Sequence, residues 1–400
     1  MSKIMRILLF SLVYFCCILS SSANYVWQRR ADFGGGVRYS TSFFSIGGKG
    51  YTGLGYDGIA HSDWWEYDPL TNIWTQKANF IGGSRWSAPA FAINNTGYVC
   101  TGTDGIYVNT CYAYSPISNS WHSVPAISSP RQDAFGFTIG SKGYITCGYA
   151  SVYHNDLWEF DPTLLTWSQK ANFPGHVRSG LIGFVIGNVA YAGTGYYLGT
   201  NYRDFYKYNQ QSNTWSQISN FIGTMRNSGS GFAVGGKGYV GIGYDGNSVF
   251  PVDFYEYDAV TDTWAQIASY PSEGRTYPFS WVINDRAYVG TGKNALNQYT
   301  TTVYELTTPF TGIDELTAEF SGSIEFFNSE STLQVSYELA EYPNSKLEIY
   351  SLLGQQLYSI QLEGSSGMKA IPKLNTNSSI SLYSLTSGNR IVHTGKLLSR

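Results

Sequence analysis

The stretch Glu66–Phe80 reads EYDPLTNIWTQKANF, and Glu159–Phe173, 93 positions later, reads EFDPTLLTWSQKANF. Two runs this similar within one chain indicate a duplicated structural unit. The pattern they share is an aromatic residue, an aspartate, a turn and a tryptophan. It recurs with substitutions in Ala113–Trp121, Lys207–Trp215 and Glu256–Trp264, so the unit repeats along much of the chain.

Six tryptophans mark the repeat, at successive intervals of 47, 47, 46, 48 and 49 residues. We take them as structural markers of the unit: Trp27, Trp74, Trp121, Trp167, Trp215 and Trp264. A period of this length is typical of propeller blades, each built from four short strands. The sequence therefore predicts an all-β fold with six blades.

Each unit carries two further marks. An arginine follows each tryptophan by about a dozen residues, and a glycine-rich strand such as Gly47–Gly58 (GGKGYTGLGYDG) comes next. The arginines are Arg38, Arg85, Arg131, Arg178, Arg226 and Arg275. This order of arginine, glycine-ended strand, aromatic–acid pair and tryptophan resembles the kelch repeat, from about residue 25 to 308. The resemblance implies a six-bladed kelch β-propeller.

The two ends of the repeat region are out of phase. Tyr25–Arg30 contains a tryptophan but no preceding inner strands, whereas the last unit, Arg275–Leu306, has inner strands but no following tryptophan. Each fragment supplies what the other lacks. We therefore expect Tyr25–Arg30 to be the outer strand of blade six, which would close the ring without an open sheet edge.

The composition agrees with a β-rich protein. Of the 400 residues, only 13 % are charged and 16 % are aromatic, and the chain has 44 glycines and 33 tyrosines. The net charge is −3, so no basic field indicates a nucleic-acid partner.

The N-terminus, residues 1–23, has the features of a secretory signal peptide. Lys3 and Arg6 precede Ile7–Leu19, an apolar run of thirteen residues, and small residues follow up to Ala23. The alternative is an uncleaved anchor, but thirteen residues are fewer than the roughly 20 that span a bilayer. We expect cleavage after Ala23, no stable membrane span, and a secreted, extracellular or outer-membrane-surface protein.

Three cysteines remain after that cleavage. Cys100 and Cys111 fall on neighbouring strands of blade two, where a disulfide can form in an oxidising compartment. Cys147 is left over, so this is no disulfide framework. The alternative is that all three are small buried hydrophobic residues.

The composition changes after Leu306, where tryptophans stop and serine and leucine rise. Residues 309–320 read as a linker, and 321–400 contain short alternating segments typical of a small antiparallel β-sandwich. The propeller is then expected over residues 24–308.

This tail resembles the C-terminal sorting domain of type IX secretion cargo in Bacteroidota. The resemblance depends on LEIYSLLGQQL (Leu347–Leu357), IPKL (Ile371–Leu374) and the order Gly354-Gln355, Ser387-Gly388, Lys396. The Tyr-Pro-Asn-Pro motif that often opens the family is replaced here by FFNSE. The alternative is a carbohydrate-binding or fibronectin-like β-sandwich.

No catalytic, metal or cofactor site emerges from the sequence. The five histidines do not pair at metal-ligand spacing: His61, His122, His154, His176 and His393. No nucleophile elbow occurs, and the ligand set of the copper-radical kelch oxidases cannot be assembled. The Asp-Gly pairs at Asp57, Asp104 and Asp245 suit hairpin turns better than calcium sites. The aspartates that begin the third strands recur at one phase, as scaffold residues do: Asp63, Asp156, Asp204 and Asp253.

The arginine series is the strongest functional lead. Six arginines at one phase form a ring near the mouth of the central channel, where they could bind carboxylates or sulfates bidentately. The structural alternative is that each arginine donates to carbonyls of its own blade.

We therefore expect a secreted or cell-surface kelch propeller that is exported by secretion machinery through its C-terminal sorting domain. It would act as a monomeric, non-enzymatic binding module for glycan or protein ligands. The alternative is a sugar-processing enzyme of the six-bladed kelch type, similar to a sialic-acid mutarotase. A third hypothesis is a repeat scaffold within an adhesion complex. Enzymatic activity stays open at this point.

Overall fold

We describe a computed structural model of the chain that covers residues 25–247, 249–308, 323–328, 332–339, 342–350, 356–372, 380–387 and 390–398. The predicted signal peptide with its cleavage site at Ala23 and the predicted linker 309–320 lie outside these residues. Throughout the described ranges the chain forms strands and connections, without a helix. Accordingly, no described segment is a helix that could cross a membrane.

Six antiparallel sheets of four strands account for residues 26–307. Blade one consists of β2 (Ser42–Ile46), β3 (Lys49–Gly53), β4 (Trp64–Asp68) and β5 (Ile73–Lys77), and blade two of β6 (Ala90–Ile93), β7 (Thr96–Cys100), β8 (Cys111–Ser115) and β9 (Ser120–Val124). Blade three consists of β10 (Phe135–Ile139), β11 (Lys142–Thr146), β12 (Leu157–Asp161) and β13 (Thr166–Lys170).

Blade four consists of β14 (Ile182–Ile186), β15 (Val189–Gly193), β18 (Phe205–Asn209) and β19 (Thr214–Ile218), with a small hairpin of β16 (Tyr196–Tyr197) and β17 (Thr200–Asn201). Blade five consists of β20 (Ser230–Val234), β21 (Lys237–Gly241), β22 (Phe254–Asp258) and β23 (Thr263–Ile267). Blade six consists of β24 (Phe279–Ile283), β25 (Arg286–Gly290), β26 (Val303–Thr307) and β1 (Val26–Arg30).

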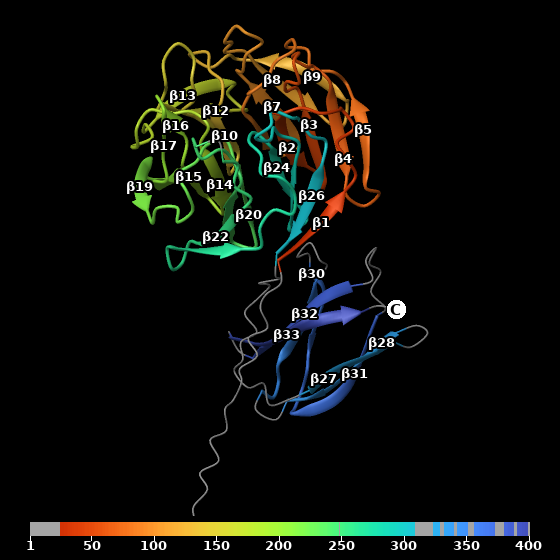
Figure 1. Cartoon of the computed structure of the whole chain (residues 1–400). Coiled ribbons are helices and arrows are strands. Elements are labelled where there is room, and N and C mark those ends of the chain that lie inside the picture. Colours follow the sequence, from red (N-terminus) through yellow and green to blue (C-terminus); the bar gives the residue numbers. More distant parts are fainter. Residues whose placement is uncertain are drawn as a thin grey trace, which may run out of the picture.

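The sheets form a closed ring (Figure 1). The first strand of each blade contacts the first strand of the next, and β24 contacts β2, which completes the circle. Residues of β2 alternate between buried and partly exposed, as expected where one face packs on the neighbouring blade and the other lines the ring centre. The all-β propeller predicted from the tryptophan spacing is confirmed.

The two faces of the ring differ in their connections. One face carries the hairpins between the first and second strands and the turns between the third and fourth; we call it the hairpin face. The opposite face carries the loops between the second and third strands and the connections between blades; we call it the loop face. This division follows from the antiparallel strand order of every blade.

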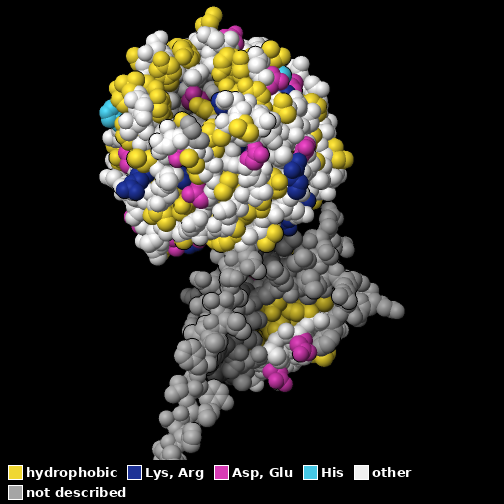
Figure 2. Space-filling model, viewed as in Figure 1, with side chains coloured by type: hydrophobic (Ala, Val, Ile, Leu, Met, Phe, Trp, Pro, Cys, Tyr) yellow, Lys and Arg dark blue, Asp and Glu magenta, His cyan; other side chains and the backbone are white. Residues whose placement is uncertain are grey.

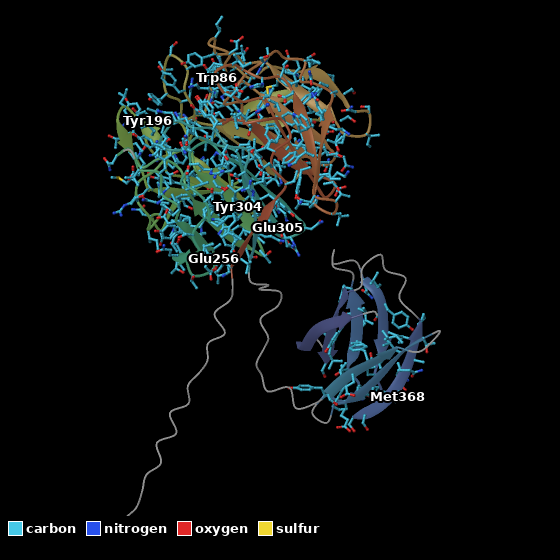
Figure 3. All side chains as sticks on the ribbon, turned by 45° about the vertical axis from the view of Figure 1, so that its right-hand side comes forward. Trp86, Tyr196, Glu256, Tyr304, Glu305 and Met368 are labelled. Carbon is cyan, nitrogen blue, oxygen red and sulfur yellow. A yellow bond between two sulfur atoms is a disulfide. The ribbon has the colours of Figure 1, made fainter. Side chains whose placement is uncertain are left out.

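Strand β1 lies far from β26 in the sequence but pairs with it over five residues, from Val26 opposite Thr307 to Arg30 opposite Val303. Arg30 donates to the buried Glu305 carboxylate at 2.7 Å, and the Tyr25 hydroxyl donates to Glu256 at 2.6 Å. Figure 3 shows Glu256, Tyr304 and Glu305 grouped in the sheets of blades five and six. Strand β26 is the third strand of blade six, and in every blade the third strand ends at the hairpin face. Because Val26 lies opposite Thr307, β1 begins at the same face. The chain therefore enters and leaves the propeller at the hairpin face.

The six repeat tryptophans tie each blade to the one before it. Every indole N–H donates to a carbonyl in the preceding blade, at 2.8–3.2 Å. Trp27 completes the series from β1 by donating to Ala268 of blade five. The tryptophans thus serve the structural role that the repeat indicates.

A second ring of hydrogen bonds surrounds the axis at the loop face. Two positions after each repeat arginine, a backbone N–H donates to the carbonyl of the equivalent residue in the preceding blade, at 2.7–3.1 Å. These six residues have left-handed backbone conformations: Ser40, Ser87, Asp133, Gly180, Ser228 and Tyr277. We call them the axial ring. The ring closes because Ser40 donates to Tyr277.

The cysteines of blade two face each other directly across β7 and β8, and a disulfide joins Cys100 to Cys111. Cys147 is a buried free thiol, and burial raises its pKa to about 12. The thiol is therefore unreactive at neutral pH.

The C-terminal region is a small β-sandwich. One sheet contains β27 (Ser323–Asn328), β28 (Thr332–Glu338) and β31 (Ser366–Pro372), and the other contains β30 (Gln356–Gln361), β29 (Lys346–Tyr350), β32 (Ile380–Ser387) and β33 (Arg390–Leu398). The two sheets share one core, in which Val335 of β28 packs with Leu347 and Ile349 of β29. The sandwich predicted from the alternating pattern is confirmed.

Candidate functional site

The six repeat arginines are buried within the blades. Each Nη1 donates, at 2.9–3.3 Å, to the carbonyl of the residue sixteen positions later, at the end of the second strand. Those acceptor residues adopt left-handed conformations, so the arginine holds the chain where it leaves the strand. Five of the six guanidinium groups also lie over an aromatic ring, as Arg226 does over Phe221 at 4.9 Å.

Four of these arginines form two-point ion pairs with the aspartate that precedes the third strand. The pairs are Arg38–Asp63, Arg131–Asp156, Arg178–Asp204 and Arg226–Asp253, with shortest distances of 2.5–2.6 Å. Burial opposes ionisation of Asp156, but hydrogen bonds from Arg131 lower its pKa overall. The carbonyl bonds in all six blades, with the ion pairs in four of them, favour the structural alternative for the arginine series.

Blades two and six lack the acid. Arg85 donates to Thr110 Oγ1 at 3.2 Å, and Arg275 donates to Thr302 Oγ1 at 2.7 Å. Burial lowers the pKa of both guanidinium groups, and the attraction of Asp104 for Arg85 and of Glu273 for Arg275 offsets this only in part. These two arginines are nevertheless as buried as the other four.

The Asp-Gly pairs lie in turns on the loop face. Asp57, Asp104 and Asp245 each accept a hydrogen bond from a backbone N–H two residues later, at 2.8–3.2 Å. The Nε2 of His61 lies 2.9 Å from Asp57. Across the described residues, histidine, cysteine and acidic side chains form no cluster of three or more that could hold a metal ion.

Partly exposed aromatic side chains surround the axis on the loop face. We call this set the aromatic rim, and Trp86 and Tyr196 are labelled in Figure 3. Its members are in contact with one another: ring centroids lie 4.8 Å apart for Tyr56–Trp86 and 4.6 Å apart for Tyr149–Tyr153. The rim comprises Tyr39, Tyr56, Trp86, Tyr107, Tyr149, Tyr153, Tyr196, Tyr197, Tyr202, Tyr244, Phe250 and Tyr299.

An exposed aliphatic side chain stands at the tip of the loop between the second and third strands of every blade. We call these six residues the crown: Ile59, Ile106, Val152, Leu198, Val249 and Leu296. Their side chains are 54–75 % exposed, at the tips of the loops between the second and third strands. In the view of Figure 2, many hydrophobic side chains border a hollow in the propeller, and charged side chains are scattered singly.

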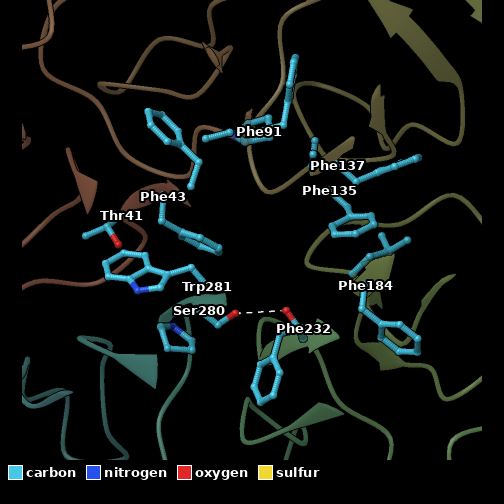
Figure 4. Close-up of a pocket in the computed structure, with 18 of the residues that line it drawn as sticks. Thr41, Phe43, Phe91, Phe135, Phe137, Phe184, Phe232, Ser280 and Trp281 are labelled. Carbon is cyan, nitrogen blue, oxygen red and sulfur yellow. Dashed lines mark hydrogen bonds between the residues drawn. The ribbon is translucent and has the colours of Figure 1, made fainter. Parts of the chain in front are cut away.

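The ring centre holds a cavity of about 450 Å³, which we call the channel (Figure 4). The axial ring lines its loop-face end. At the next level, Phe43 is the one large side chain beside small residues of the other five blades: Ala90, Gly136, Gly183, Gly231 and Ser280. Figure 4 shows Phe43 and Phe135 facing each other across the open centre. Gly183 is needed there, because a Cβ would come 2.5 Å from the Phe135 ring.

Asp133 and Tyr277 break the six-fold symmetry of the axial ring. They come from blades three and six, on opposite sides of the axis, and their side chains interact across the channel. Burial raises the pKa of Asp133 to about 6, although hydrogen bonds from Ser87, Tyr277 and Gln132 act in the opposite direction. Neither residue was predicted from the sequence. The available signal was an acid at a repeat position that elsewhere holds serine, glycine or tyrosine.

Comparison with known proteins supports the fold alone. No protein-family model and no curated protein matches this chain. A solved structure, "Structure of YjhT", is similar with a TM-score of 0.60 and 17 % identity, over 69 % of this chain and 96 % of that one. The shared architecture is a propeller of the kelch type.

Proposed function

We propose that this chain is a secreted, cell-surface binding module that holds a protein partner on the loop face of its propeller. The observation that carries the proposal is the crown, which places one exposed aliphatic side chain on each blade around the same axis. A group of exposed apolar side chains rimmed by polar residues is typical of a protein interface. The tyrosines and Trp86 of the aromatic rim are of the residue types that dominate binding energy at such interfaces.

The exits of the chain support this assignment. Both ends of the propeller, near Tyr25 and Thr308, leave at the hairpin face. Whatever holds the termini therefore acts on the side away from the crown. The loop face stays free for a partner.

The C-terminal sandwich is proposed to direct export, after a signal peptide cleaved behind Ala23 has taken the chain through the inner membrane. The similarity to type IX sorting domains supports this role. Of the residues behind that similarity, Ser387 lies on β32 and Lys396 on β33, while Gly354, Gln355 and Gly388 lie outside the described residues. The proposal includes a monomer without cofactor and without nucleic acid.

A sugar-processing role is less well supported. It requires an acid or a histidine beside an arginine that is available to a ligand. All six repeat arginines are buried and bonded within their own blades. Binding without turnover therefore fits the geometry better.

The test places charge on the crown. The mature full chain with Ile59→Glu, Ile106→Glu and Val152→Glu is compared with a matched variant of the hairpin face, Leu70→Glu, Ile117→Glu and Leu164→Glu, whose residues are 69–90 % exposed. Binding to the surface of producing cells is measured by flow cytometry, with partners mapped by cross-linking mass spectrometry. We expect the crown variant to lose binding and the hairpin-face variant to keep it.

Treatment of the cells separates the classes of ligand. Protease treatment of the cell surface should abolish binding, and periodate oxidation of surface sugars should leave it intact. The opposite pattern would identify a glycan ligand, for which the tyrosine faces of the rim are also suited. Equal binding by both charge variants would contradict a loop-face site.

A further inference from the structure

The loop-face end of the channel differs in chemistry from its walls. Its walls are formed by aromatic residues, among them Phe43 and Phe135, and by small aliphatic residues, whereas its loop-face end carries hydroxyl groups and one carboxyl group. Asp133 is the one charged side chain among the described residues that line the cavity. A cavity of about 450 Å³ falls within the roughly 300–1,000 Å³ range of small-molecule sites.

Among the residues that the structure describes, no cationic side chain pairs with Asp133. The side chains that interact with it, those of Ser87, Tyr277 and Gln132, are all neutral. The neighbouring Arg131 is bound to Asp156, with bonds of 2.6 and 2.9 Å. Asp133 is partly exposed and lines the channel, where a carboxylate without a counter-charge is costly, so a ligand that supplies a positive charge gains more here than on the surface.

Three hydroxyl groups at this end are unsatisfied. They line the cavity, are buried, and have no hydrogen-bond partner among the described residues: Ser40 Oγ, Thr41 Oγ1 and Ser228 Oγ. Buried polar atoms usually have partners, and an exception often marks a place for a ligand or an ordered water. An ammonium group donates three hydrogen bonds, which matches a carboxylate flanked by free hydroxyls.

Tyr277 lies at the same end of the channel. Its left-handed backbone, with a φ of +55°, is shared by the other five residues of the axial ring and therefore belongs to the repeat. What distinguishes this position is the side chain, because Tyr277 is the one aromatic residue of the axial ring and lines the channel together with Asp133.

We propose that the channel binds a small amphiphilic amine, with its ammonium group at Asp133 and a flat hydrophobic body between Phe43 and Phe135. The ligand enters from the hairpin face, where the channel is lined by Ser45, Ala92, Thr138, Val185, Ala233 and Val282. Aromatic rings on both sides suit a planar body. This site is independent of the loop-face proposal, because it lies inside the ring.

The test is isothermal titration calorimetry on the mature full chain at pH 7.5 with three probes that share a phenylethyl body and differ in charge. They are 2-phenylethylamine, 2-phenylethanol and 3-phenylpropanoate. We expect the amine to bind at least tenfold more tightly than the alcohol and the acid. Asp133→Asn should abolish that preference and leave the weak binding of the alcohol unchanged.

Two variants complete the design. Asp285→Asn makes the same charge change on an exposed hairpin of blade six, and it should keep the preference for the amine. Ala233→Phe fills the channel and should abolish binding of all three probes while the melting temperature shows a folded protein. Equal affinities for the three probes, no binding by any of them, or an amine preference that survives Asp133→Asn would overturn the proposal.

Discussion

The guanidinium of Arg131 donates two hydrogen bonds to the carboxylate of Asp156, at 2.6 and 2.9 Å, and its side chain is fully buried. Arg85 occupies the same repeat position in blade two but faces Thr110. The two arginines therefore provide a comparison within one fold between a buried pair and a buried lone charge.

We expect Arg131→Met to destabilise the propeller more than Arg85→Met. The first change leaves Asp156 without its counter-charge, which typically costs about 3–5 kcal/mol. The second leaves no orphan carboxylate and loses hydrogen bonds to backbone carbonyls, at roughly 1–3 kcal/mol. Urea unfolding at pH 7 measures both. Equal losses of unfolding free energy in the two variants would show that the ion pair with Asp156 adds nothing to the carbonyl bonds that both arginines make.

Blade two can be completed by substitution. Thr110→Asp supplies the carboxylate that four other blades have, so we expect it to stabilise the fold by about 1.5–3 kcal/mol, the range for hydrogen bonds to charged groups. The gain should appear as a rise of roughly 3–12 °C in melting temperature, at about 2–4 °C per kcal/mol. Thr110→Asn, similar in shape and uncharged, is the control and should give no gain. A melting temperature that falls in the aspartate variant would mean that desolvation of the acid outweighs the pairing.

Removal of residues 24–31 should destabilise the ring severely. The deletion takes away five residues of strand pairing, the Arg30–Glu305 ion pair and the Trp27–Ala268 bond, and it exposes β26 as a sheet edge. We expect a melting temperature lower by more than 10 °C and aggregation on heating, because a domain of this size shifts about 2–4 °C per kcal/mol. Differential scanning calorimetry measures the shift. The substitution Arg29→Ala, at an exposed position of the same strand, should change the melting temperature little.

Much of the fold could be predicted from the sequence because its cause is local and repeated. Each tryptophan donates to the preceding blade, so one residue type at one interval marks one blade. Asp63 and its equivalents were recognised as scaffold residues from their phase, but their arginine partners lie 25–27 residues earlier and meet them only through the path of the loop. The spacing of residues in the sequence does not show how that loop folds back.

The channel was missed for the opposite reason. Asp133 and Tyr277 are 144 residues apart and matter because they differ from their counterparts in the other blades. A repeat pattern is defined by the residues that the blades share, so a residue found in one blade alone does not contribute to it. Their contact also depends on ring closure, since only a six-membered circle places blades three and six opposite each other.

The stability of the fold should depend on pH through Asp133. Burial raises its pKa to about 6 in the folded state, compared with 3.8 for an unperturbed aspartate. The folded protein therefore holds the proton more tightly than the unfolded chain. The contribution to stability is complete below about pH 4 and is lost as the pH rises to about 6.

Asp133→Asn removes this loss, so we expect the variant to be more stable than the natural chain at pH 7.5 by about 3 kcal/mol, since one pKa unit is worth about 1.4 kcal/mol. Near pH 4, where the aspartate is neutral in the folded state, the two proteins should be equally stable. Tyr277, the titratable group that faces Asp133, has a raised pKa and stays protonated throughout this range. Urea unfolding of both proteins from pH 4 to 8 gives the difference directly. A stability difference that does not change with pH would mean that Asp133 carries the same charge in the folded and unfolded states.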